Sequence, residues 1–211
     1  MNEPRMDSGT RESLLSAGRQ LFAAHGYKGA SVRAITGAAR ANLGAITYHF
    51  GSKAALYDAV LEQTLTPFRE RLRAAANSAG SPLERVQSFV RAFFEHLHEH
   101  PELRGLMVRE LSTEQPIPKA VLVTFQANFG ALSRLIGEGQ AAGEIREGDP
   151  MMLALATAAQ PVALNLVRPV LEQAGAVRFE SPEARDRLVD NAIRFVVEGL
   201  TARGGDEGGL P

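Results

Sequence analysis

The residues best suited to binding chemistry are hydrogen-bonding and small side chains between positions 42 and 49. Hydroxyl, amide and imidazole groups donate or accept hydrogen bonds, and small residues let another molecule approach closely. Base edges and phosphates of DNA are surfaces that such side chains can contact, whereas Tyr48 and His49 have the alternative role of covering a core edge. The residues of this predicted face are Asn42, Gly44, Ala45, Thr47, Tyr48 and His49.

Catalytic patterns are missing from the sequence. It contains no Ser-His-Asp set, no phosphate-binding glycine loop and no paired carboxylates at a suitable spacing. His96 and His100 are four residues apart and could share a zinc ion, but no neighbouring carboxylate pattern completes that site. Histidines near a helix C-terminus also complement the helix dipole. We therefore expect no catalytic residue, no metal and no cofactor. The main interpretation is a DNA-binding regulator, and the two alternatives are an enzyme and a helical adaptor protein.

Composition and charge favour a soluble protein with a basic first quarter. The chain has 211 residues, 45% apolar and 22% charged, and no cysteine, which excludes disulfides and thiolate metal sites. Residues 1–53 carry seven Lys or Arg against three acidic residues, whereas the remainder carries 16 basic and 21 acidic residues. This asymmetry suits a module that meets a polyanion through one end. No apolar run approaches the length of a membrane helix and no signal peptide is visible, so we expect a cytoplasmic protein without a membrane partner.

Helices must position these residues, because apolar side chains recur at spacings of three and four throughout the chain and never alternate over strand-length runs. Ser31, Asn42, Ser52, Ser81 and Ser181 stand where helix caps are expected. The pattern predicts an all-α fold of nine helices. The predicted ranges are 10–25, 31–39, 42–50, 52–77, 82–100, 102–113, 119–142, 150–174 and 182–202.

The second and third predicted helices are short and closely spaced, and together they have the form of a helix-turn-helix unit. The third helix would enter the DNA major groove, with Leu43, Ile46 and Phe50 facing the core. This organisation divides the chain into a helix-turn-helix domain and a helical ligand-binding and dimerisation domain. The predicted boundaries are a disordered tail over 1–9, the DNA-binding domain over 10–53, the body over 54–203 and a disordered tail over 204–211.

Two motifs carry a resemblance to a known family. The segments LFAAHGYKGASVRAI and GAITYHFGSKAAL, within residues 10–60, resemble the DNA-binding head of the tetracycline-repressor (TetR-like) family. The first places an aromatic-glycine-aromatic turn before the second helix, and the second covers the recognition helix and the start of the fourth. A weaker likeness, which includes the Arg109-Glu110-Leu111-Ser112 run, points to the CecR-like branch, whose members are linked to drug sensitivity and export.

The resemblance implies roles for individual residues. Asn42, Ala45 and Thr47 would face bases or nearby phosphates, and Tyr48 and His49 would lie against the backbone. Ser31 and Lys53, each near a helix N-terminus, would hold phosphates, and Arg33 either contacts DNA or lies on a solvated face. Two positions depart from the family pattern: Arg40 stands where glycine is common in the turn, and Leu43 replaces the usual lysine or arginine.

The body supplies candidates for a small-molecule pocket and for a dimer interface. Aromatic residues are mostly core but can line a pocket, and Arg109 either forms a surface ion pair with Glu110 or faces a ligand. Apolar residues on more than one face of the last two helices predict a four-helix homodimer interface, and helix 52–77 would be a rigid rod between head and body. The ligand-binding candidates are Phe93, Arg109, Phe125, Phe129 and Gln160.

These features together predict a ligand-responsive transcriptional regulator. A two-fold dimer would read a palindromic DNA operator, and a small molecule that favours one position of the rod would release it. Repression is the usual sign of regulation in the family that the motifs resemble. The sequence names neither the operator nor the effector.

Overall fold

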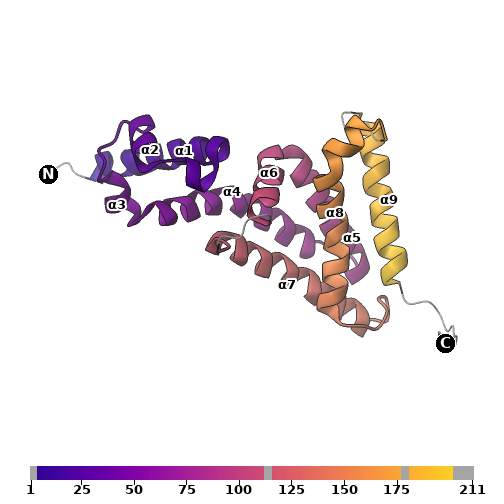
Figure 1. Cartoon of the computed structure of the whole chain (residues 1–211). Helices are drawn as coiled ribbons and strands as arrows, with labels where there is room; N and C mark the ends of the chain where they lie inside the picture. Colours follow the sequence, from indigo (N-terminus) through magenta and orange to yellow (C-terminus); the bar gives the residue numbers. More distant parts are fainter. Residues whose placement is uncertain (1–3, 112–115, 177–180, 202–211) are drawn as a thin grey trace. The chain divides into compact units, whose positions relative to one another are not determined.

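The computed structural model describes residues 4–111, 116–176 and 181–201, and these residues form helices and their connections, with a single isolated β-bridge between Ile145 and Thr201. Figure 1 shows the helices in chain order. Their bounds are α1 Pro4–Gly29, α2 Val32–Ala38, α3 Ala45–Phe50, α4 Lys53–Ala76, α5 Pro82–Glu99, α6 Pro101–Leu111, α7 Lys119–Ala141, α8 Pro150–Gln173 and α9 Pro182–Leu200. The prediction of an all-α fold with nine helices is confirmed over the described residues.

Side-chain caps fix most of the helix starts. Ser81 accepts from the Glu84 amide while Glu84 reaches back to the Ser81 amide, which completes a capping box. Asp149 accepts from the Met151 and Met152 amides at the start of α8. Because these caps satisfy amides that a helix leaves unpaired, the sequence predicted these starts correctly.

Two ends of the first helix differ from the prediction. α1 begins at Pro4, so residues 4–9 are helical instead of a disordered tail, and proline is well suited to a first helical position. Gly26 interrupts the helix as predicted, with φ 69°, but a further turn continues to Gly29. Residues 1–3 and the predicted tail over 204–211 lie outside the described residues.

The chain divides into two compact units. Unit 1 comprises Met1–Pro67 with Arg109–Val123, and unit 2 comprises Phe68–Val108 with Thr124–Pro211. The predicted boundary at residue 53 falls inside unit 1, because the first part of α4 packs with the helix-turn-helix. Pro67, which the rod prediction did not consider, lies inside α4 at the limit of unit 1, where its missing amide removes one helical hydrogen bond.

The core of unit 1 forms where α1 packs against α4. A side chain at Gly18 would come within 3.3 Å of Val60, so the absence of one lets the two helices approach closely. Leu14, Ile35 and Leu56 are completely buried, and Ile46 of α3 is 1% exposed. This core holds the short helices α2 and α3 in place against α1.

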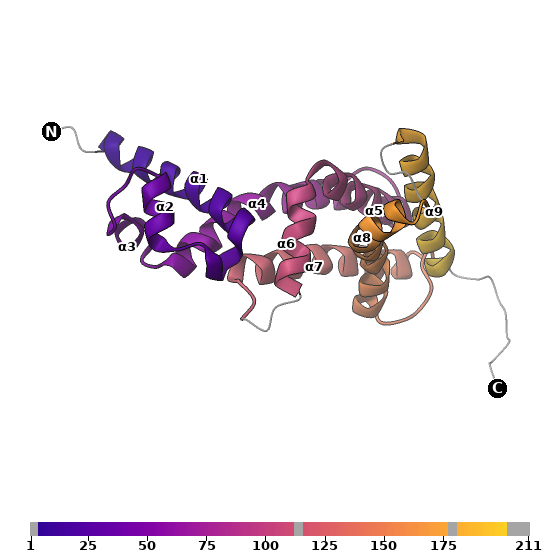
Figure 2. The same cartoon turned by 45° about the horizontal axis from the view of Figure 1, so that its top comes forward.

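Unit 2 contains α5, α8 and α9, which lie side by side in Figures 1 and 2. Val86, Phe89 and Val90 of α5 are at most 1% exposed. α9 turns its apolar stripe toward α5 and α8, which buries Ala192, Val196 and Leu200. Their own protomer already covers these three side chains, so they are not available to the homodimer interface that the sequence predicts for the last two helices.

Candidate nucleic-acid interface

α2 begins at a side-chain cap, and the turn after it needs an unusual backbone conformation. The Ser31 hydroxyl accepts from the Ala34 amide at 3.1 Å, so this oxygen is engaged as an N-cap. Arg40 has φ 52°, in the left-handed region that favours glycine, and it is the one non-glycine residue with positive φ in the described chain. The turn therefore has the geometry that a glycine would give, despite the arginine at this position.

α3 presents a polar and highly exposed face. Tyr48 is 77% exposed, and Thr47 lies exposed beside it. This exposure of Tyr48 excludes the alternative that it covers a core edge within this unit. His49 is half-buried, and its ring centre lies 4.9 Å from that of Tyr48. Asn42, Gly44 and Arg33 are also exposed.

The exposure of Leu43 and of Ala45 is the reverse of the prediction. Leu43 was predicted to face the core and is 64% exposed, whereas Ala45 was predicted on the outer face and is 6% exposed. The reason is that α3 begins at Ala45, with Gly44 and not Asn42 as its N-cap, so the helical spacing of three and four does not extend back to Leu43. Leu43 thereby joins the exposed face and Ala45 leaves it.

Two cationic side chains lie near the C-terminal end of this helix. The Lys53 ammonium, in the first residue of α4, lies 4.4 Å from the centre of the Tyr27 ring, and partial burial lowers the pKa of Lys53. The Arg11 guanidinium lies 5.1 Å from the centre of the Phe50 ring. Both contacts are cation–π interactions, which hold the charges beside α3.

An exposed set of hydroxyl and amide groups on a short helix, flanked by cations, can read base edges and hold phosphates. Lys53 and Ser31 stand at the N-termini of α4 and α2, where unpaired amides and the helix dipole also favour an anion. The residues of this recognition face are Arg33, Asn42, Leu43, Gly44, Thr47, Tyr48 and His49.

The five predicted ligand-binding residues are divided between the two units. Phe93 is 4% exposed and packs edge-on against Phe68, with ring centres 4.9 Å apart. Phe125 is 49% exposed and stacks on Phe129, and Gln160 is half-buried. These four belong to unit 2, whereas Arg109 belongs to unit 1.

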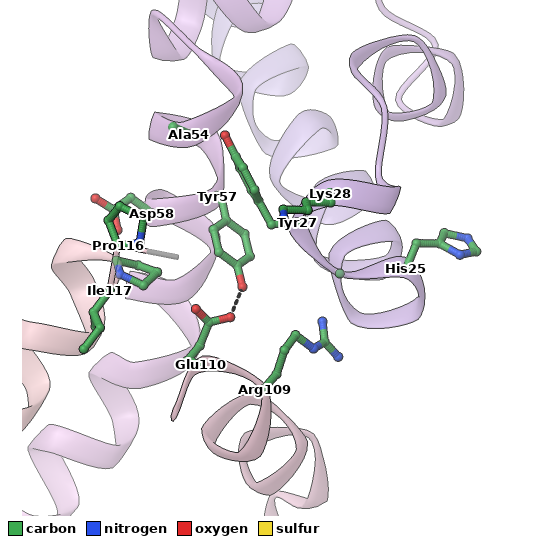
Figure 3. A pocket seen from close by; sticks show the side chains of 12 residues that line it. His25, Tyr27, Lys28, Ala54, Tyr57, Asp58, Arg109, Glu110, Pro116 and Ile117 are labelled. Atoms are coloured by element: carbon green, nitrogen blue, oxygen red, sulfur yellow. Dashed lines mark hydrogen bonds between the residues drawn. The ribbon is translucent and has the colours of Figure 1, made fainter. Parts of the chain in front are cut away.

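Arg109 lines a pocket of about 530 Å³ within unit 1, shown in Figure 3. We call it the tyrosine pocket, because Tyr27 and Tyr57 form part of its wall with ring centres 5.1 Å apart. Sequence analysis missed both tyrosines as pocket residues, since Tyr57 belongs to an apolar helix pattern and Tyr27 to the turn before the second predicted helix. The complete lining is His25, Gly26, Tyr27, Lys28, Ala54, Tyr57, Asp58, Arg109, Glu110, Pro116, Ile117 and Pro118.

Two consecutive residues of α6 bind different helices at this pocket. Arg109 donates to the Phe22 carbonyl at 2.6 Å and to the Ala23 carbonyl at 3.2 Å, both on α1. Glu110, 7% exposed, accepts from the Tyr57 hydroxyl of α4 at 2.5 Å. Burial and this hydrogen bond raise the pKa of Tyr57, so its phenol stays protonated and donates. The alternative of an Arg109–Glu110 surface ion pair is thus replaced by separate contacts with α1 and α4.

Two family models match the chain. Residues 14–60 match the model of bacterial regulatory proteins of the tetR family, and residues 82–196 match the tetracyclin repressor-like C-terminal domain. The first match contains α2, α3 and Lys53, which form the candidate interface.

Similar proteins are also regulators. The chain is 26% identical over 200 residues to the HTH-type transcriptional regulator RutR of Escherichia coli K12, covering 94% of each chain. The structure of FadR from Bacillus subtilis, solved with stearoyl-CoA, matches with a TM-score of 0.72 at 17% identity over 89% of this chain and 98% of that one. AibR, solved with isovaleryl coenzyme A and operator DNA, matches with a TM-score of 0.66 at 15% identity over 88% and 97%.

The two structural likenesses show a shared fold, and the family models cover both the helix-turn-helix and most of the helical body. The chain therefore belongs to the tetR family of bacterial regulatory proteins, which are DNA-binding transcription regulators and not enzymes.

Proposed function

We propose that the protein is a homodimeric repressor that leaves a palindromic operator when a small molecule binds. The observation that carries this proposal is the recognition face of α3, where Tyr48 is 77% exposed beside an exposed Thr47. The exposed side chains of Thr47 and Tyr48 add little to the core of their own unit, and their hydroxyl groups can contact base edges.

Phosphate contacts would position this face on the duplex. Lys53 and Arg33 supply positive charge, and the N-termini of α2 and α4 add unpaired amides. Asn42, Thr47 and Tyr48 would then supply the sequence-dependent contacts. Ala45 supports the geometry from inside, since its small buried side chain lets α3 pack close to the core.

The exposed surface of α8 and α9 supports a homodimer. Leu166 is 53% exposed, Val170 67% and Phe195 63%, and a lone protomer would leave these side chains in water. α8 also has the length and apolar composition of a membrane span, with a mean hydropathy of 1.4, contrary to the sequence expectation. In a DNA-binding regulator, a second copy of the chain would bury this surface, because a two-fold interface brings the same patch from both protomers together.

Solved structures that share this fold support the proposal of a small-molecule effector. FadR and AibR were solved with acyl-coenzyme A molecules, and AibR also with operator DNA. We infer that this chain likewise couples a small-molecule site to its operator, with α4 as the connecting helix because its first residue is Lys53. Such a regulator acts in the cytoplasm, where both DNA and metabolites are present.

Fluorescence anisotropy with DNA from upstream of the protein's own gene tests the DNA-binding part. We expect saturable binding by two protomers for each operator, with an affinity that falls steeply as salt rises, because phosphate contacts release counterions. Equal affinity for operator and scrambled duplexes at every salt concentration would contradict the proposal.

A further inference from the structure

We propose that the tyrosine pocket is a binding site for a flat organic acid, an aromatic carboxylate, whose binding opposes binding of DNA. Its effect on DNA rests on the function proposed above, whereas the existence of the site does not. The pocket lies entirely within unit 1, and none of its lining comes from unit 2.

The size and walls of the pocket suit a small ring. Its volume of about 530 Å³ lies within the range of small-molecule sites, which extends from about 300 to 1,000 Å³. Tyr27 and Tyr57 offer aromatic surface, and Pro116 and Ile117 add apolar surface on another side, as Figure 3 shows. Aromatic rings pack favourably in stacked or edge-on arrangements on such walls.

The pocket offers two cationic groups to an anion, Arg109 and Lys28. Both carboxylates already accept hydrogen bonds from the protein: Glu110 from the Tyr57 hydroxyl, and Asp58 from the Ala120 amide at 3.2 Å. Arg109 uses two of its five N–H donors on carbonyls, so donors remain, and the exposed Lys28 adds a second cation. A ligand carboxylate would therefore find unused donors, and charge-assisted bonds to a guanidinium are strong.

The position of the pocket links it to the DNA-binding residues. Lys53 holds its ammonium over the Tyr27 ring, so a ligand that packs on Tyr27 changes the surroundings of a residue assigned to phosphate. A carboxylate that draws Arg109 toward the pocket also weakens its hydrogen bonds to the Phe22 and Ala23 carbonyls of α1. Ligand and operator then oppose each other, and by linkage each lowers the affinity of the other by the same factor.

Fluorine NMR of the full-length protein labelled with 3-fluorotyrosine tests the site directly. The chain has three tyrosines: Tyr27 and Tyr57 line the pocket, and Tyr48 lies on the recognition face. Single Tyr→Phe variants assign the three signals. Sodium benzoate should shift the Tyr27 and Tyr57 signals saturably, with a Kd of about 1 mM for so small a ligand, and leave Tyr48 unmoved. Benzamide, which has a similar shape but no charge, should bind at least about tenfold more weakly than benzoate.

A matched pair of variants separates the pocket from general effects. Ala54→Phe places a ring in the pocket and should abolish the saturable shift, whereas Ala55→Phe, at the next exposed position outside the lining, should preserve it. Lys28→Gln removes an exposed charge without disturbing the core and should weaken benzoate binding about threefold to tenfold. Equal benzoate affinity in the Ala54→Phe and Ala55→Phe variants would overturn the assignment.

Operator DNA distinguishes the two proposals. DNA should shift Tyr48, and saturating benzoate should lower operator affinity about tenfold or more. If DNA shifts Tyr48 while benzoate up to about 50 mM leaves Tyr27 and Tyr57 unmoved, the pocket proposal fails and the proposed function stands. If benzoate binds without changing operator affinity, the regulatory half of the inference is overturned. If benzoate binds but no DNA shifts Tyr48, the proposed function fails and the site stands.

Discussion

The recognition face of unit 1 and the α8–α9 surface of unit 2 both expose large side chains, but their chemistry differs. On α3, Tyr48 is 77% exposed and stands among hydroxyl and amide groups. On α8 and α9, the exposed large residues are apolar, with Val170 at 67% and Phe195 at 63%. The first surface suits a wet, charged partner that hydrogen-bonds, whereas the second suits a partner with a matching apolar surface.

The difference also extends to the helices beneath the two surfaces. α3 has six residues and depends on Ile46 and Ala45 to hold it in place, whereas α8 has 24 residues with an N-cap of its own. A short helix with small buried residues can approach another molecule closely. A long helix presents a continuous apolar stripe, which is what a four-helix interface requires.

The largest expected effect comes from a charge placed on the apolar surface of α8 and α9. Leu166→Asp would place two unpaired carboxylates in a two-fold interface, and burying an unpaired charge costs several kcal/mol. We expect the dimer dissociation constant to rise by about 1,000-fold or more, as measured by sedimentation equilibrium. Ala127→Asp, at an exposed position of α7, is the control and should remain dimeric. A dimeric Leu166→Asp protein would show that another surface pairs the protomers.

The polar surface is tested by variants with different signatures. Thr47→Ala and Tyr48→Ala should each weaken operator binding by about 10-fold to 100-fold and relax preference at individual base pairs. Lys53→Ala should weaken binding to all sequences alike and reduce the slope of log affinity against log salt by about 0.9, because one phosphate contact is lost. Binding titrations at several salt concentrations measure both effects. Unchanged slopes for Lys53→Ala would remove it from the set of phosphate contacts.

Unit 1 also contains a buried hydrogen bond between Tyr57 and Glu110, which provides a test of its stability. Tyr57→Phe would leave the 7%-exposed Glu110 without its hydroxyl donor and should destabilise the protein by about 1–3 kcal/mol at pH 7. The pKa of Tyr57 is raised in the folded state, so above pH 10 the unfolded state binds fewer protons and stability falls as pH rises.

Urea unfolding between pH 9 and pH 11 measures this dependence. The advantage of the native protein over Tyr57→Phe should be fully present below about pH 10 and shrink above it by up to about 1.4 kcal/mol per pH unit. A constant difference between the two proteins across this range would show that the phenol ionises equally in both states.

The smallest expected effect concerns the turn that precedes the recognition face. Arg40→Gly should stabilise the protein by about 0.5 kcal/mol, because relief of left-handed strain slightly exceeds the entropy cost of glycine. Gly51→Ala, at φ 82° with open space around the position, should destabilise it by about 1–2 kcal/mol. Thermal unfolding of both variants measures these changes, and an Arg40→Gly protein that is less stable would point to a stabilising contact of the arginine.

Sequence reasoning succeeded where local signals decide structure. Ser31, Ser81 and Ser181 marked helix starts because a capping side chain acts within three residues of itself. It failed at Leu43 and Ala45, where the face depended on a helix start without a side-chain cap. It also missed the tyrosine pocket, since residues from α1, α4 and α6 come together only through tertiary packing and no local spacing reports this.

Hydroxyl-radical footprinting of the upstream DNA tests the central claim most directly. The account predicts two protected patches related by two-fold symmetry and separated by a whole number of helical turns, about 10.5 base pairs or a multiple of it. Thr47→Ala should change the sequence preference inside both patches equally and leave their spacing the same. A single asymmetric patch, or a footprint in which Thr47→Ala and Tyr48→Ala behave as the native protein, would contradict a dimer that reads its operator through α3.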